Sequence, residues 1–283
     1  MNEFQLNIEH LEERVLLSGN VFVDGAFLVV EGTAGDDVIE VRQIGDELRI
    51  LINDFDHGRF QAPEIIPTLF TPQLRVLSFA GNDNIQFQAG VTTAARVEAG
   101  AGDDIVRTGA GDDHVFGGDG VDRLFGRAGK DLLVGDDGND QIWGQADRDS
   151  IHGLEGDDYL VGGTGNDFIR GGAGDDVLIG KDGDDRLNGE NGDDILSGGA
   201  GNDNVTGGHG QDILFGGTGD DEVAGGSGSD TLRGGSGNDH ISGGFGNDTL
   251  RGDSGDDRLD GGDHNDTATD LGELLHINIE FNI

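Results

Sequence analysis

Between residues 99 and 260, hydrophobic positions recur with a period of nine, and the polar residues around them repeat as well. The unit occurs 18 times without an insertion, and its copy at 171–179 reads GGAGDDVLI. Position 8 is always valine, leucine or isoleucine, position 6 is always aspartate, and glycine is usual at positions 1, 2 and 4. This fixed period predicts an all-β solenoid of stacked units, with position 8 inside and positions 7 and 9 outside.

The segment before the array, residues 21–98, is predicted to be a β-rich cap. Hydrophobic and polar residues alternate at 48–52, as in a half-buried strand. Two fragments, 35–39 and 81–85, resemble the core of the repeat and are embedded in longer stretches. We therefore expect wider coils that lead into the array and cover its first coil.

At the other end, a nineteenth unit begins at Gly261 and decays by Thr269. Residues 263–283 are predicted to supply one short capping strand, because apolar and polar side chains alternate along the tail. The apolar positions are Leu275, Ile277, Ile279, Phe281 and Ile283. Such a strand would hide the open edge of the last coil.

Residues 1–20 are a possible export segment. They lack the basic start and the apolar core of an ordinary secretory signal peptide. However, residues 11–18 read LEERVLLS, which resembles the L-E-x-R-x-L-L-S motif near the start of many exported planctomycete proteins. A short amphipathic helix that ends near Gly19 is the alternative interpretation.

Stacking the units would bring the position-6 carboxylates into columns at the strand spacing of about 4.8 Å. At an effective dielectric near 20, each neighbouring pair of charges would repel by roughly 3–4 kcal/mol. A divalent hard cation would remove this repulsion, since it pairs with carboxylates and takes further ligands from the carbonyl oxygens of a glycine-rich loop. Glycine at positions 1, 2 and 4 suits such a loop.

Calcium is the cation that the residues favour. Magnesium demands a stricter octahedron and keeps its waters, and zinc prefers cysteine or ordered histidine, whereas the chain has no cysteine and eight scattered histidines. The predicted metal ligands are the position-6 aspartates: Asp104, Asp113, Asp122, Asp131, Asp140, Asp149, Asp158, Asp167, Asp176, Asp185, Asp194, Asp203, Asp212, Asp221, Asp230, Asp239, Asp248 and Asp257.

The pattern G-G-x-G-x-D-x-U-x, where U is a large apolar residue, resembles the calcium-binding nonapeptide of the repeats-in-toxin (RTX) family, also called the hemolysin-type repeat. The resemblance covers residues 99–262 and implies a right-handed parallel β-roll with two nonapeptides per turn. In that roll x-U-x forms a short strand, the preceding six residues form the calcium loop, and each ion lies between loops one coil apart. Nine loops on each side would then give about 16 Ca²⁺ sites. The family also implies an alternative role for the tail, as a C-terminal export signal.

Departures from the motif are few. Position 4 is not glycine once, at Asp147, so the unit that begins at Gly144 is predicted to be the weakest loop. Substitutions at position 2 are expected to matter less, because any residue supplies a backbone carbonyl. They are Arg127, Asp136, Gln145, Leu154, Lys181, Glu190 and Asp253.

The two outer faces differ in character. The face of the even-numbered units is mainly polar from Ser150 onward, whereas the face of the odd-numbered units carries Ile105, Phe125, Trp143, Tyr159, Val161, Val177, Ile179, Ile195, Ile213 and Phe215. An apolar strip of this length exceeds what soluble monomers usually expose. We therefore hypothesise a homo-oligomer or a protein partner on the Phe125, Trp143, Tyr159 and Ile179 face. The alternatives are that the N-terminal segment covers it, or that β-branched residues are there for strand propensity.

The sequence favours a binding and structural function over catalysis. It contains no H-E-x-x-H, G-x-S-x-G or P-loop motif, and we expect no enzyme activity and no transmembrane helix. Seventeen basic against 57 acidic residues argue against nucleic acid. We expect a secreted, extracellular module that folds on calcium at millimolar levels. The alternatives are a calcium-dependent adhesin or surface-layer component, and an accessory domain of an enzyme system.

Overall fold

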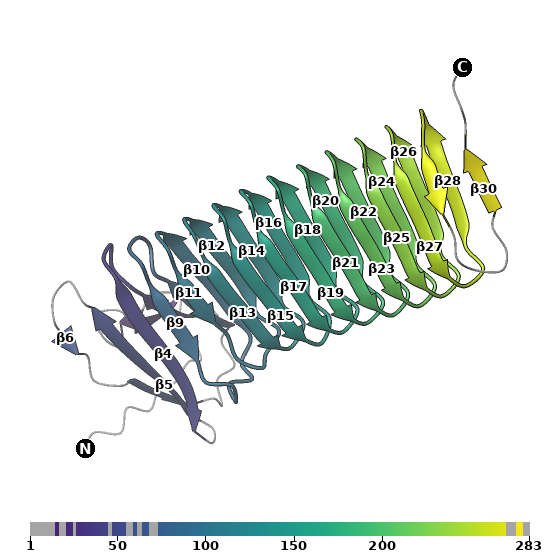
Figure 1. Ribbon diagram of the computed structural model, residues 1–283. Helices are drawn as coiled ribbons and strands as arrows, with labels where there is room; N and C mark the ends of the chain where they lie inside the picture. The colour runs from purple at the N-terminus through teal and green to yellow at the C-terminus, as the bar shows by residue number, and fades with distance from the viewer. Residues whose placement is uncertain are drawn as a thin grey trace.

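The computed structural model describes residues 15–16, 21–24, 27–44, 47–54, 59–60, 64–67, 73–269 and 276–279. Within these ranges the chain forms strands and no helix, so none is available to span a membrane. The strands stack into an elongated roll of about 11 turns, with the N-terminal strands at one end and the last strand at the other (Figure 1). The predicted all-β, right-handed parallel β-roll is confirmed.

Among the described residues, two sheets of 15 strands each form the walls of the roll, and their strands pair in parallel throughout the repeat array. The sheet of the even-numbered units, here the even sheet, contains β10 (Ala95–Ala101), β12 (His114–Asp119), β14 (Leu132–Asp137), β16 (Ser150–Glu155), β18 (Phe168–Ala173), β20 (Arg186–Asn191), β22 (Asn204–His209), β24 (Glu222–Ser227), β26 (His240–Phe245) and β28 (Arg258–Asp263). The odd sheet contains β9 (Asn84–Phe87), β11 (Ile105–Arg107), β13 (Arg123–Ala128), β15 (Gln141–Ala146), β17 (Tyr159–Thr164), β19 (Val177–Asp182), β21 (Ile195–Ala200), β23 (Ile213–Thr218), β25 (Thr231–Ser236), β27 (Thr249–Ser254) and β29 (Thr267–Thr269).

Successive units alternate between the two sheets, so two units complete one coil. Each residue therefore pairs with the residue 18 positions further along, as Arg186 pairs with Asn204 and Leu187 with Val205. Position 8 points inward throughout, and its side chains are at most 2% exposed. These aliphatic residues form a single continuous core that reaches Leu28 and Ile39 in the N-terminal segment.

The strands are longer than the three residues that the family resemblance implied. A typical strand runs for six residues, from position 7 of one unit to position 3 of the next, and only positions 4 to 6 form a turn. The additional length is held by bonds between coils, in which the position-4 N–H donates to the position-3 carbonyl of the following coil. Gly156 N, for example, donates to Ala173 O at 2.8 Å.

The N-terminal strands extend both sheets beyond the first complete unit. On the even side β1 (Val15–Leu16) and β2 (Val21–Asp24) lead into β3 (Phe27–Glu31), which pairs in parallel with β8 (Gln73–Leu77), and β8 pairs with β10. On the odd side β4 (Asp37–Ile44) pairs in parallel with β9 and antiparallel with β5 (Glu47–Asp54). Strands β6 (Arg59–Phe60) and β7 (Glu64–Pro67) pair with β5. The described N-terminal strands thus lie at the end of the roll (Figure 1).

The C-terminal end continues the same pattern for part of a coil. Strand β29 pairs with β27, and β30 (His276–Ile279) pairs in parallel with β28. Three of the predicted apolar tail positions, Leu275, Phe281 and Ile283, lie outside the described residues, as does most of the segment before Val21.

Candidate metal centres

The 18 predicted aspartates form two columns, one along each long edge of the roll where the turns lie. Each is the last residue of a turn, directly before a strand, and each side chain is at most 3% exposed. The odd column runs from Asp104 to Asp248 and the even column from Asp113 to Asp257. The stacking of the units therefore brings together all of the residues that the repeat predicted.

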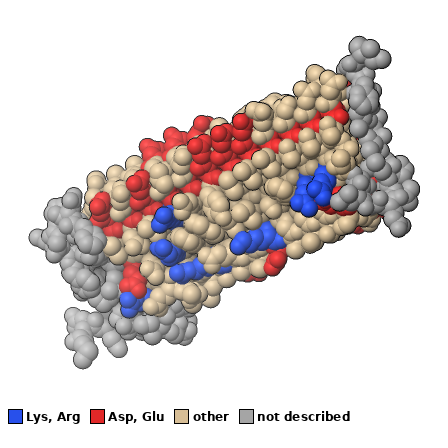
Figure 2. Space-filling view, viewed as in Figure 1, with Lys and Arg blue, Asp and Glu red and all other residues tan. Residues whose placement is uncertain are grey.

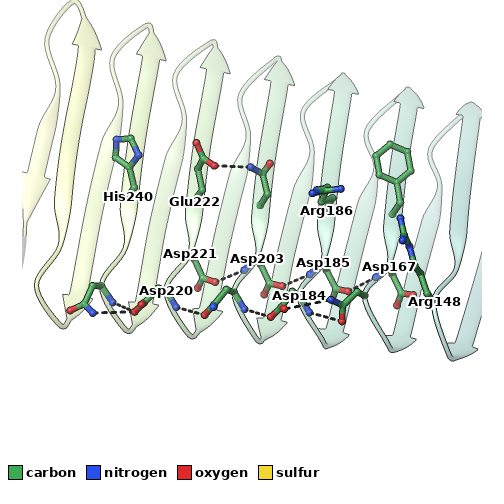
Figure 3. Close-up of a pocket in the computed structure, with 15 residues that line it drawn as sticks. Arg148, Asp167, Asp184, Asp185, Arg186, Asp203, Asp220, Asp221, Glu222 and His240 are labelled. Carbon is green, nitrogen blue, oxygen red and sulfur yellow. Dashed lines mark hydrogen bonds between the residues drawn. The ribbon is translucent and has the colours of Figure 1, made fainter.

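Hydrogen bonds along each column fix one oxygen of every carboxylate. The backbone N–H of each position-6 residue donates to Oδ1 of the aspartate one coil later, as Asp158 N does to Asp176 Oδ1 at 2.8 Å. The same bond links Asp167 to Asp185 and Asp185 to Asp203 (Figure 3). Each aspartate therefore connects two coils through its own side chain.

The odd column is longer than the sequence predicted. Asp37 N donates to Asp83 Oδ1 at 2.7 Å, and Asp83 N donates to Asp104 Oδ1 at the same distance. At the other end Asp248 N donates to Asp266 Oδ1 at 3.0 Å. The repeat-like fragments were recognised, but these three aspartates were not included among the ligands. Reading the fragments in phase gives complete nonapeptides at 32–40 and 78–86.

The second carboxylate oxygen is buried without a hydrogen bond in nearly every unit. Among the predicted aspartates this holds for Oδ2 of all except Asp113 and Asp257, and it holds for Asp83 and Asp266 as well. A buried acceptor without a partner is costly, and the cost rises when the group is charged. A row of such oxygens is therefore a strong indication that a cation belongs beside them.

Glycine at position 1 leaves the space that these oxygens face. A Cβ built on Gly153 would overlap Asp158 Oδ2 and would lie 2.8 Å from the carbonyl oxygen of Gly171, one coil later. The carboxylate oxygen and this carbonyl oxygen thus border the same small volume. At positions 2 and 4 a Cβ would instead overlap the carbonyl oxygen one coil earlier, as a Cβ on Gly172 would overlap Leu154 O.

These oxygens match what calcium requires. Calcium takes six to eight oxygen ligands from carboxylates and backbone carbonyls in flexible geometry. In the part of the chain that the structure describes, no three His, Cys, Asp or Glu side chains cluster as a metal site. A calcium ion here would therefore take much of its ligand shell from the backbone, which explains why the turn sequence repeats so strictly.

Burial dominates the electrostatics of the columns. It raises the pKa of Asp158 to about 8 and that of Asp122 to about 7, and neighbouring carboxylates add to the shift. The pKa of Asp203 rises to about 6 for the same first reason. Transfer out of water is thus the larger effect on these pKa values, and the repulsion between stacked carboxylates predicted from the sequence adds to it. Without a cation, burial therefore disfavours the charged form of these carboxyl groups.

The irregular units keep the backbone of the regular ones. All seven position-2 substitutions adopt a positive φ, between 75° and 91°, where glycine stands elsewhere. Asp147 at position 4 has a φ of 74°, and Asp149 in the same unit still accepts a hydrogen bond from Asp131 N at 2.9 Å. The loop predicted to be weakest therefore has an unbroken turn, and weaker calcium binding there stays a prediction.

A second, exposed ladder runs beside each aspartate column at position 5, and the sequence analysis missed it. On the even edge Asn202 N donates to Asp184 Oδ1 at 2.9 Å and Asp220 N donates to Asn202 Oδ1 at 2.8 Å (Figure 3). These bonds point in the opposite direction to those at position 6. Asparagine and aspartate alternate here from Asn166 to Asp256, so charged neighbours are two coils apart and their repulsion is reduced.

Charged side chains are distributed unevenly over the surface of the roll. Acidic side chains form a row along one long edge of the roll, with Lys and Arg in separate groups on the face below it (Figure 2).

On the odd face Phe125 and Trp143 stack with ring centroids 4.7 Å apart, and Tyr159 tilts against Trp143. Val161 is buried, whereas Tyr159, Ile213 and Phe215 are 37–39% exposed. The predicted apolar strip exists, but adjacent rings cover part of it.

The fold and the two columns define a parallel β-roll repeat protein with oxygen-lined corners suited to calcium. In agreement, the family model described as RTX calcium-binding nonapeptide repeat matches repeatedly between residues 98 and 268, at 98–133, 125–160, 152–187, 188–223, 215–250, 224–257 and 242–268. The chain belongs to the RTX calcium-binding nonapeptide repeat family. A search of curated proteins finds no match. The family confirms calcium as the ion that these repeats bind, while the individual aspartate ligands stay predictions.

Proposed function

We propose that this protein is a secreted calcium-binding β-roll that folds when it meets extracellular calcium and then serves as a rigid structural or interaction module. The observation that carries the proposal is the row of buried Oδ2 atoms without hydrogen bonds, which from Asp122 onward face a position-1 glycine. A folded roll without cations must keep these carboxyl groups buried, which raises their pKa values and disfavours the charged form. Binding of calcium to the folded state alone would shift the equilibrium toward the roll.

About 16 ions would bind within the 18 regular units, one between each pair of loops on the same edge. They would bring about +32 charges against a formal net charge of −40. The loaded rod would keep a modestly acidic surface, which favours solubility. Sites of this kind fill at millimolar calcium outside cells and stay empty at cytosolic levels, so folding would be coupled to export. No catalytic role is part of this proposal.

The test is a calcium titration of the chelated protein, followed by far-ultraviolet circular dichroism. A cooperative gain of β-structure with calcium, and none with magnesium at the same concentration, is the expected result. A chain that is already folded in chelator would show that hydrogen bonds and the aliphatic core suffice, and the proposal would then fail.

A calcium-dependent adhesin or surface-layer component is the second candidate. The observation in its favour is the set of exposed apolar side chains on the odd sheet, including Tyr159, Ile195, Ile213 and Phe215. Assembly through this face would make calcium-dependent oligomers at micromolar protein concentration. Replacing Trp143 and Ile179 by serine should then lower the sedimentation coefficient of the calcium-loaded protein, and a monomer in both forms would remove this candidate.

A further inference from the structure

Position 1 changes character at the N-terminal end of the roll. From Gly117 to Gly261 it is always glycine, but the units that begin at 78, 99 and 108 carry Ser78, Ala99 and Thr108 there. In the regular units a Cβ at this position would overlap the Oδ2 atom of the aspartate five residues later, or come close to it. The first units therefore place side-chain atoms in the volume where the later units have none.

Thr108 closes its corner with a hydrogen bond. Its side chain is fully buried, and Oγ1 donates to the carbonyl oxygen of Gly126 at 2.7 Å. Gly126 O is the oxygen that, in a regular corner, shares the open volume with the aspartate Oδ2 atom. The aspartate of this unit is Asp113, and both of its carboxylate oxygens accept backbone hydrogen bonds, from Ala95 N at 2.7 Å and Gly109 N at 3.3 Å. The Thr108 hydroxyl also lowers the pKa of Asp113, which burial raises to about 6.

A fixed positive charge lies at the same corner. Arg127 Nη1 donates to Thr108 O at 2.8 Å and to Phe87 O at 2.6 Å. Arg127 occupies position 2 with a φ of 75°, a conformation that favours glycine. Its positively charged guanidinium therefore donates hydrogen bonds to backbone carbonyl oxygens at the first even turn, and it occupies the place of a bound cation there.

The odd edge has a similar arrangement one coil earlier. Ser78 is fully buried, and its Oγ donates to the carbonyl oxygen of Ala99 at 2.7 Å. Ser78 also lowers the pKa of Asp83, whose burial raises it to about 7. Before that unit, Thr33 donates from its N–H to Asp37 Oδ2 at 2.5 Å and from its hydroxyl at 3.2 Å. Ser78 thus places a hydroxyl group at position 1, but Asp83 Oδ2 stays buried without a hydrogen bond, so this corner is not closed as the Thr108 corner is.

We propose that the Thr108 corner (Thr108, Asp113, Gly126 O and Arg127) is closed by protein groups in place of a calcium ion. It stays formed in the absence of calcium and gives the calcium-loaded coils an ordered end on which to stack. This inference rests on the proposed function, because it contrasts this corner with the calcium corners that follow. Each unit of a solenoid is stabilised by contacts with an ordered neighbour. An N-terminal end that is ordered without calcium therefore lowers the barrier to calcium binding by the coils that follow.

The test is hydrogen exchange measured by mass spectrometry on the full chain, in excess chelator and in calcium. In chelator, the peptide that spans 95–113 should exchange at least about tenfold more slowly than the peptide that spans 162–203. Thr108→Val keeps the shape and removes the hydroxyl, so it should abolish that difference, whereas Thr108→Ser should keep it. Thr206→Val makes the same chemical change at position 9 of the even sheet and should leave it unchanged.

A further variant separates closure by protein groups from simple misfolding. Thr108→Gly restores the regular corner, so its 95–113 peptide should lose protection in chelator and regain it in calcium. If the wild-type peptide is already as unprotected as 162–203 in chelator, the inference is overturned while calcium-driven folding stands. If all coils are protected in chelator, the proposed function fails. The Thr108 variants then decide the inference alone: loss of protection in Thr108→Val but not in Thr206→Val supports it, and equal behaviour refutes it.

Discussion

Gly171→Ala is the sharpest test of why position 1 is glycine. A Cβ on Gly171 would overlap Asp176 Oδ2 and would lie 2.8 Å from Asp176 Cγ and from Gly189 O. The added methyl group must therefore displace a buried carboxylate that also accepts the Asp158 N–H. The backbone of Gly171 is not left-handed, so alanine adds no φ strain and the effect is that of overpacking alone.

Overpacking of a rigid interior costs about 1–3 kcal/mol. We expect the apparent free energy of unfolding in saturating calcium to fall by about 2 kcal/mol, with a lower urea midpoint by circular dichroism. The calcium concentration at half-folding should rise as well, because the displaced carboxylate borders the predicted ion. Gly90→Ala is the matched control, since a Cβ there meets nothing within 4 Å. Equal urea and calcium midpoints for Gly171→Ala and Gly90→Ala would refute the reasoning.

Three further predictions address charge and backbone strain. Asp176→Asn keeps an oxygen for the Asp158 N–H but removes the charge, so the calcium midpoint in a titration should rise about tenfold, or about 1.4 kcal/mol, without earlier unfolding in chelator; an unchanged midpoint would exclude Asp176 as a ligand. Burial raises the pKa values of the column aspartates in the folded state from 3.8 to about 6–8. Proton binding by these carboxyl groups therefore stabilises the folded state, and this effect is complete below about pH 4. It is then lost as the pH rises through the folded pKa values, so any metal-free roll should resist urea better at pH 5 than at pH 8, and the opposite order would contradict the buried columns. Leu154→Gly relieves a φ of 91° at an exposed position. It should raise the free energy of unfolding by about 1 kcal/mol, measured as a higher urea midpoint. A lower midpoint would mean that contacts of the Leu154 side chain stabilise the fold by more than its backbone strain costs.

Much of the roll could be predicted because its information is local and periodic. One aliphatic residue per nine fixed the inward face, and the invariant aspartate fixed the two columns. The strand length could not be read in the same way, because positions 1 to 3 pair through backbone atoms and leave little trace in side-chain chemistry. The family pattern suggested three-residue strands, whereas bonds such as Gly156 N to Ala173 O extend them to six.

The ends of the columns were harder for a different reason. Asp37 and Asp83 are 46 residues apart yet joined by a direct hydrogen bond, and the intervening hairpin of β4 and β5 hides the common phase of their units. The position-5 ladder was missed because its residues vary between asparagine, aspartate and others. Most of them share a side-chain oxygen that accepts the next N–H, although Val121, Lys130 and Arg148 have none, and only stacking makes this pattern visible.

The sequence by itself determined the repeat, the aliphatic core and the preference for calcium, whereas the alternation of units between two walls was implied by the family resemblance. The first three follow from residue types at a fixed spacing, and the spacing survives in any arrangement that stacks the units. Only the tertiary structure decided which carboxylate oxygen is hydrogen-bonded and which faces open space, how far the odd column extends, and why Thr108 and Arg127 differ from the residues in later units. The reason is physical: these features depend on contacts between residues 18 to 46 positions apart, and such contacts exist only once the coils are in register.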